Sequence, residues 1–135
     1  MKVAVNPQSK KFWLAYPEGW QPIHGHEITI DKYRFSAAPI KKGVLVSEVT
    51  TGMRVNLFPH NMLSAIMGAT KEGSLDYYET FIAPVLVKAI KRNPNFDKIL
   101  VEGNNQVKNL GIGNMPSVED FDDSILTDPV SDIQH

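Results

Sequence analysis

The sequence of 135 residues contains no cysteine. A chain without thiols forms neither disulfides nor thiolate zinc sites, and the absence fits a reducing cytoplasm. The sequence also has no apolar run of about 18 residues, the length that a membrane-spanning helix needs. Residues 1–11, MKVAVNPQSKK, lack the apolar core of a secretory signal. We therefore expect a cytoplasmic protein with no membrane partner.

Charge of either sign is not in excess, because 14 lysines and arginines nearly balance 15 acidic residues, for a formal net charge of −1. Such a chain has no overall positive field to hold nucleic acid, so we expect no nucleic-acid partner. A composition of 42% hydrophobic and 21% charged residues is that of an ordinary globule. This length suits one domain that buries about two-thirds of its unfolded surface.

Sequence motifs of catalysis are missing as well. There is no Gly-x-Ser-x-Gly elbow for a serine nucleophile and no His-Glu-x-x-His pattern for zinc. The glycines at 111 and 113 are not followed by the lysine of a phosphate-binding loop. We expect no cofactor, and these absences favour a protein that is not an enzyme.

What the sequence does contain is a strong strand signal at residues 33–58. Two runs of alternating side chains flank a turn at residues 40–43, which predicts a β-hairpin. The second run, residues 44–57, is predicted as one strand. Burying the apolar side chains of both strands on the same side places Arg34 opposite Thr50 and Ser36 opposite Glu48.

The opposite face of this hairpin is a candidate ligand-binding surface. A bare Gly52 would permit a close approach to the backbone, and arginine offers bidentate geometry to an anion. The alternative is the solvated outer face of a sheet covered on its other side by helices. The candidate ligand-binding residues are Arg34, Glu48, Thr50 and Arg54.

The N-terminal third of the chain is predicted to be mostly β-strand. Residues 2–5 and 11–16 alternate around a turn at 6–9 and are predicted to pair as a first hairpin. A second turn is expected at 17–20, then an irregular stretch to Gly25, then a strand over 26–30.

Apolar spacing changes to the helical period after Asn61, an acceptable N-cap, and Gly73 is a plausible stop. Ser74 is expected to cap a second amphipathic helix, which Pro84 kinks or breaks. Residues 98–102 are predicted as a last strand. The fold class expected is α+β, an antiparallel β-sheet of about five or six strands covered by a helical pair.

Composition shifts to Gly, Asn, Ser and Asp after residue 103, so we expect a single α+β domain over 1–104 and a loop and acidic tail over 105–135. Residues 119–132 carry six acidic side chains and no basic one. The tail is predicted to be flexible. Alternatively it is an acidic arm that docks on a basic partner or a neighbouring subunit through Phe121, Ile125 and Leu126.

Histidines form one cluster that resembles a metal site. His24 and His26 lie two apart, so they point to the same side of a strand, and His60 would supply a third nitrogen for zinc or iron. The other interpretation is that the first two are turn residues beside a glycine. The candidate metal ligands are therefore His24, His26 and His60.

The first 60 residues resemble small, uncharacterised accessory proteins of bacteriophages and related mobile elements. The resemblance lies in Tyr33-Arg34-Phe35, Lys42-Gly43, Val46-Ser47-Glu48 and Thr51-Gly52, with Asn6-Pro and Lys11-Phe-Trp upstream. It implies a small cytoplasmic protein of a bacterial host that binds something rather than turning it over. It implies no catalytic residue.

Three hypotheses follow. The first is a non-enzymatic binding protein that acts by protein–protein contact or by capture of a small anionic ligand. The second is a metal-assisted hydrolase that uses the three histidines. The third is a self-assembling structural subunit, a homo-oligomer joined through its helices or an exposed sheet edge.

Overall fold

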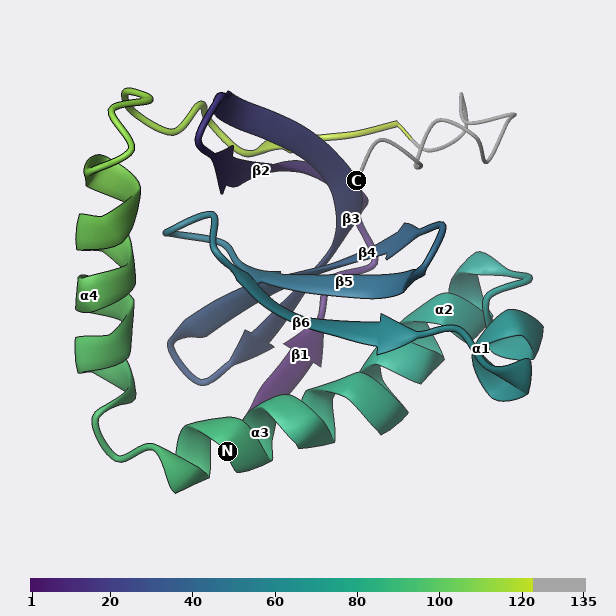
Figure 1. Cartoon of the computed structure of the whole chain (residues 1–135). Coiled ribbons are helices and arrows are strands. Elements are labelled where there is room, and N and C mark those ends of the chain that lie inside the picture. Colours follow the sequence, from purple (N-terminus) through teal and green to yellow (C-terminus); the bar gives the residue numbers. More distant parts are fainter. Residues whose placement is uncertain (123–135) are drawn as a thin grey trace.

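Seven strands form one antiparallel sheet within residues 1–122, the part of the chain that the computed structural model describes (Figure 1). The strand order is β6-β5-β4-β3-β2-β7, and β1 pairs with β3. The predicted α+β class, with an antiparallel sheet and covering helices, is confirmed. The strands are β1 (Val3–Val5), β2 (Lys10–Tyr16), β3 (Gly19–Ile30), β4 (Tyr33–Ile40), β5 (Gly43–Glu48), β6 (Arg54–Pro59) and β7 (Glu119–Asp120).

Strand β3 joins the two halves of the sheet. Its first half pairs with β2, and its second half pairs with β4 on one side and β1 on the other. Gly25 lies at the changeover, where an added Cβ would collide with the carbonyl oxygen of Ala37. The predicted first hairpin is therefore wrong, because β1 and β2 each pair with β3 rather than with one another. The irregular stretch expected before Gly25 is also wrong, since pairing with β2 keeps it extended.

The central hairpin forms as β4 and β5, but the single strand predicted over 44–57 does not. Strand β5 ends at Glu48, the chain turns over residues 49–53, and β6 runs back along β5. The predicted register is also wrong, because Ser36 lies opposite Ser47 and Phe35 opposite Glu48. The physical reason is a local competition: the Glu48 carboxylate accepts the N–H groups of Thr50 and Thr51, which closes a turn in place of a longer ladder.

Helices cover one face of the sheet as a nearly continuous rod (Figure 1). It consists of α2 (Lys71–Tyr77), a π-helical turn η1 (Tyr78–Ile82) and α3 (Ala83–Arg92), preceded by the short α1 (Met62–Met67). Pro84 lies in the first turn of α3, so the π-helical turn stands where an interruption was expected. The core beneath this rod contains Ile28, Ile30, Phe35, Ala37, Val44, Val46, Tyr77, Tyr78, Ile82, Ala83, Leu86 and Ile90.

Two helix boundaries and one predicted strand differ from the sequence prediction. Asn61 does cap α1, because its side chain accepts the Ser64 N–H at 2.8 Å. The first helix ends at Met67, however, and Thr70 rather than Ser74 caps the next one. Gly73 lies inside α2 instead of ending a helix. Residues 98–102 are wrong as a strand, since they belong to α4 (Phe96–Lys108).

A second core lies on the other face of the bent sheet. The N–H of Ala15 in β2 donates to the carbonyl of Gly52 at 2.9 Å, so β2 folds over toward the turn between β5 and β6. Both strands β4 and β5 are consequently buried on both faces. This second core contains Phe12, Leu14, Ile23, Ala38, Ile40, Leu45 and Val49.

The segment after α4 returns along the outside of β2. The indole of Trp13 donates to the carbonyl of Ser117 at 3.0 Å, and β7 then pairs with Lys10 and Lys11. The domain boundary predicted after residue 104 is wrong, because it falls inside α4 and residues up to 120 contribute to the sheet. The remainder of the predicted tail, with Ile125 and Leu126, lies outside the described residues. Among the helices of residues 1–122, none has both the length and the apolarity to cross a membrane.

Candidate functional site

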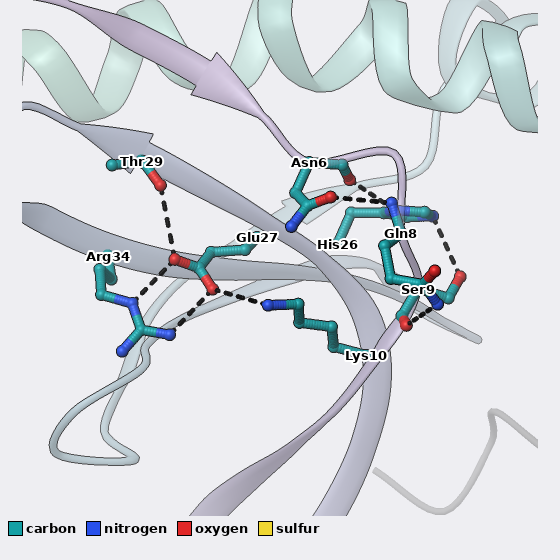
Figure 2. Close-up of polar contacts among 8 residues, drawn as sticks. All are labelled: Asn6, Gln8, Ser9, Lys10, His26, Glu27, Thr29 and Arg34. Atoms are coloured by element: carbon teal, nitrogen blue, oxygen red, sulfur yellow. Dashed lines mark hydrogen bonds and ion pairs between the residues drawn. The ribbon is translucent and has the colours of Figure 1, made fainter. Parts of the chain in front are cut away.

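Arg34, the first predicted ligand-binding residue, is bound within the protein. Its Nε donates to Glu27 Oε2 at 2.8 Å and its Nη2 donates to Oε1 at 3.0 Å. Figure 2 shows Arg34 and Lys10 both pointing at Glu27, with the Lys10 ammonium 3.9 Å from the carboxylate. The hydrogen bond from Arg34, followed by the two positive charges, holds the pKa of the Glu27 carboxyl below its ordinary value against the opposing effect of burial.

The other residues of the predicted face do not assemble around Arg34. Glu48 is buried opposite Phe35, whose ring lies in the core under the helices, so Glu48 is on the other face of the sheet from Arg34. Its carboxylate accepts the Thr50 hydroxyl at 2.8 and 2.9 Å. Arg54 is exposed on β6 and does lie on the Arg34 face, by its pairing with Ser47. The four residues therefore form no single surface.

A row of polar side chains crosses the sheet where this surface was expected. Glu27, Ser36 and Ser47 lie opposite one another on β3, β4 and β5, and all three are buried. The hydroxyl oxygen of Ser47 is fully buried and has no hydrogen-bond partner in the described part of the chain. A buried polar atom without a hydrogen-bond partner is destabilising, and this can be tested by mutation. Because all three side chains are buried, the row is not an open binding surface.

The three histidines are not brought together. His60 Nε2 lies 2.9 Å from the carbonyl oxygen of Ile40, whereas the His24 ring stacks on Phe121 with centroids 3.9 Å apart. His26 is buried, and its Nδ1 lies 2.9 Å from the carbonyl oxygen of Asn6. Within residues 1–122, no group of three or more His, Asp or Glu side chains is placed to hold a metal ion. The predicted three-histidine metal centre is therefore not formed.

What the fold does form is a groove between the sheet and the elbow joining α1 to α2. It consists of two cavities of about 310 and 360 Å³, of the size that small-molecule sites occupy. The two cavities share four wall residues, so they adjoin. We call the pair the elbow groove, and its shared wall is Pro39, Gly68, Ser74 and Tyr78.

One end of the elbow groove is polar. Its wall includes Lys71, the hydroxyls of Ser9 and Thr70, and the imidazoles of His24 and His26. No acidic side chain is found among the described residues that line it. His26 Nε2 lies 3.4 Å from the Ser9 hydroxyl oxygen in this wall (Figure 2). This end of the groove is therefore lined by one lysine and several polar side chains.

The other end of the elbow groove is mainly apolar. Val44, Ala65 and Tyr77 line it together with His60 and Ser64. Val44 and Tyr77 belong to the core beneath the helical rod, so the cavity opens onto the edge of that core. The groove as a whole therefore changes from polar to apolar along its length.

Small residues at the elbow make room for the groove. The chain turns sharply between α1 and α2, and the Gly68 N–H donates to the Ser64 carbonyl at 2.8 Å. A Cβ on Gly68 would lie 2.8 Å from that same oxygen, too close to be tolerated without a shift. Sequence reasoning missed this site because it treated residues 61–73 as one helix. The sequence did contain a signal for a break between two helices. Gly68 and Ala69 are small residues, and the Thr70 that follows them is a good N-cap.

Comparison with known proteins adds no further assignment. No protein-family model matches the chain, and neither the curated proteins nor the solved structures include a match to it.

Proposed function

We propose that this protein is a non-enzymatic binding protein that captures a small anionic ligand in the elbow groove. One observation carries the proposal: two adjoining cavities of about 310 and 360 Å³ form one groove, whose described wall has a lysine, two imidazoles and several hydroxyl-bearing side chains at one end and apolar side chains at the other. Ligand sites are typically concave, with a few convergent polar groups on a mostly apolar wall. In keeping with the sequence-based expectation, we place this binding protein in the cytoplasm of a bacterial host.

Hydrogen-bonding capacity at the polar end supports an anion over a cation. The Thr70 oxygen accepts the Gly73 N–H at 3.0 Å, which leaves its own O–H proton available to donate toward the groove. The Lys71 ammonium offers only donors. Charge-assisted hydrogen bonds of this kind are about twice as strong as neutral ones. A carboxylate or phosphate group is therefore the chemical partner that this wall fits.

Titration calorimetry with inorganic phosphate and acetate tests the proposal on the full chain. The wild-type protein should bind at least one of the two anions saturably. Lys71→Met should weaken that binding by about tenfold, the loss of one charge-assisted contact. Lys88→Met is the matched control, because Lys88 is also an exposed helical lysine but lines neither cavity. Absence of saturable binding, or equal affinity in Lys71→Met, would refute anion capture in this groove.

A self-assembling subunit is the second candidate, and exposed apolar side chains on α1 favour it. Met62 is 81% exposed, Ile66 is 66% exposed and Leu63 is 42% exposed. Apolar side chains gathered on one exposed element are typical of protein–protein contacts. Multi-angle light scattering of the wild type and of Met62→Lys with Ile66→Lys decides this case. A monomeric mass for the wild type that does not change with concentration would rule out the self-assembling subunit.

A further inference from the structure

We infer that the smaller cavity of the elbow groove is a binding site for a neutral aromatic molecule that carries one hydroxyl or N–H group, such as a phenol. The site lies at the Tyr77 end of the groove, where α1 and α2 face β4 and β5. The inference goes beyond the proposed anion capture, because it uses no charged group of the larger cavity and holds whether or not an anion binds there.

An almost buried phenol without a partner is the first argument. Tyr77 is 7% exposed and lines the smaller cavity. Its ring lies 5.3 Å from that of Phe81, centroid to centroid, but its hydroxyl makes no hydrogen bond within residues 1–122. In that part of the chain, Ser47 has the one fully buried side-chain oxygen or nitrogen that lacks a partner, so the Tyr77 oxygen borders open space. We place that oxygen at the cavity, because the side chain is otherwise buried in the core beneath the helical rod.

A second hydroxyl borders the same space. Ser74 lines the cavity from α2, and a Cβ added to Gly68 would lie 4.0 Å from Ser74 Oγ, so this hydroxyl faces the elbow. It makes no hydrogen bond to another residue of the described chain. Each hydroxyl can both donate and accept a hydrogen bond. A ligand with a single O–H or N–H group can therefore bond either one, which is how a mainly apolar site fixes the orientation of its ligand.

The wall of the smaller cavity favours an uncharged ligand. Among the described residues that line it there is no lysine, arginine, aspartate or glutamate. His60 is the one basic group in this wall, and its Nε2 already lies 2.9 Å from the Ile40 carbonyl oxygen. A charged group in such a site would lose its hydration without gaining an opposite charge, which is costly.

Size and lining favour a ring. Pro39, Val44 and Ala65 supply apolar walls, and Tyr77 adds an aromatic ring. An apolar cavity of about 150 Å³ is enough to bind benzene. The smaller cavity has about 310 Å³, so it has room for a molecule of one or two rings. Aromatic rings also attract one another beyond the effect of the area that they bury, which favours an aromatic ligand beside Tyr77 over an alkyl one.

NMR titrations of the full-length protein with phenol and toluene test the inference, because the two probes differ only in whether the ring carries a hydroxyl or a methyl group. Phenol should bind saturably. The ratio of phenol affinity to toluene affinity should fall by about two- to tenfold in Tyr77→Phe, the loss of one neutral hydrogen bond. Tyr16→Phe is the matched control, because Tyr16 lines neither cavity, and it should leave the ratio unchanged. The same ratio in Tyr77→Phe and in the wild type would overturn the inference.

A second variant and a charged probe test the placement and the ligand class. Ala65→Leu narrows the cavity and should weaken phenol and toluene binding severalfold. Ala4→Leu is the control, because Ala4 is exposed on β1 and lines neither cavity. Benzylammonium, which has the same ring with a positive charge, should bind at least about tenfold more weakly than phenol.

Unchanged phenol binding in Ala65→Leu, with folding confirmed by circular dichroism, would overturn the inference, as would equal affinities for phenol and benzylammonium. No saturable binding of phenol would also overturn it. That result would leave anion capture intact, because the phosphate and acetate titrations test anion capture separately.

Discussion

Glu27 and Arg34 hold β3 and β4 together through a bidentate pair on the face of the sheet that the helices leave uncovered. The two hydrogen bonds measure 2.8 Å from Nε and 3.0 Å from Nη2. The carboxylate side chain is 9% exposed and the guanidinium side chain is 41% exposed, so the pair is partly shielded from water. Arg34 thus has a structural role that accounts for its position without any ligand.

Replacing Glu27 by Gln should lower the free energy of unfolding at pH 7 by about 1–2 kcal/mol, because the charge-assisted pair is lost but is partly screened by solvent. Urea denaturation measures the change. Glu18→Gln is the control, since Glu18 is exposed in the turn between β2 and β3, and its effect should stay within about 0.5 kcal/mol.

The pH dependence of the same variant follows from the lowered pKa of Glu27. A carboxyl whose folded pKa is depressed stabilises the fold fully above its unfolded pKa, about 4.3, and the contribution is lost as the pH falls through the folded value. The stability difference between wild type and Glu27→Gln should therefore be largest at pH 6–7 and shrink below about pH 4. A difference that stays constant down to pH 3 would contradict the assignment.

Gly52 is expected to tolerate no side chain. Its φ is +75°, and an added Cβ would lie 2.6 Å from Cζ3 of Trp20 and 3.0 Å from the carbonyl oxygen of Trp13. Gly111 has a similar φ of +70° but has nothing within 4 Å of an added Cβ. Gly111→Ala should cost about 1 kcal/mol for the backbone conformation alone, and Gly52→Ala should cost clearly more. Equal losses in thermal or chemical denaturation would show that Trp20 moves aside freely.

Ser47→Ala should leave the stability unchanged or raise it by up to about 1 kcal/mol, because the substitution removes a buried hydroxyl that has no partner in the described residues. Ser64→Ala is the contrasting variant. The Ser64 hydroxyl accepts the Asn61 N–H at 2.8 Å in the capping box of α1, and its loss should destabilise by about 1 kcal/mol. A marked destabilisation by Ser47→Ala, measured by denaturant titration, would mean that this hydroxyl is hydrogen-bonded in solution.

Phe121→Ala should loosen β7 and the adjacent rim of the elbow groove, because the ring that stacks on His24 is lost. The amide of residue 121, which donates to the Ser9 carbonyl at 2.8 Å, should then exchange its hydrogen faster. Phe81→Ala is the control, since Phe81 is 42% exposed on η1 and contacts Tyr77 instead. Exchange at residue 121 that is the same in both variants would show that β7 is held by its backbone pairing alone.

Local patterns identified most of the elements but not their partners. Alternation over 11–16 and 26–30 is enough to predict strands, because a half-buried strand needs a period of two. It cannot show that β1 and β2 both pair with β3, since any extended edge offers the same hydrogen-bonding groups. The turn at Glu48 was missed for a similar reason: alternation continues through residues 49–53, and only the folded chain reveals that the Glu48 side chain bonds its own backbone.

Local sequence patterns also could not show which distant residues form the candidate site. His24 and His26 do lie in one cavity wall, as their spacing suggested, but Lys71 and Tyr78 come from helices more than 40 residues later in the chain. No periodicity connects such residues.

By itself, the sequence determined the fold class, the position of the central hairpin, the Asn61 cap and the absence of thiol chemistry, because each depends on near neighbours or on composition. Only the tertiary structure decided the strand pairing, the turn after Glu48, the helical state of residues 98–102 and the elbow groove. These depend on which distant surfaces exclude water together, and burial is a property of the whole chain rather than of any local segment.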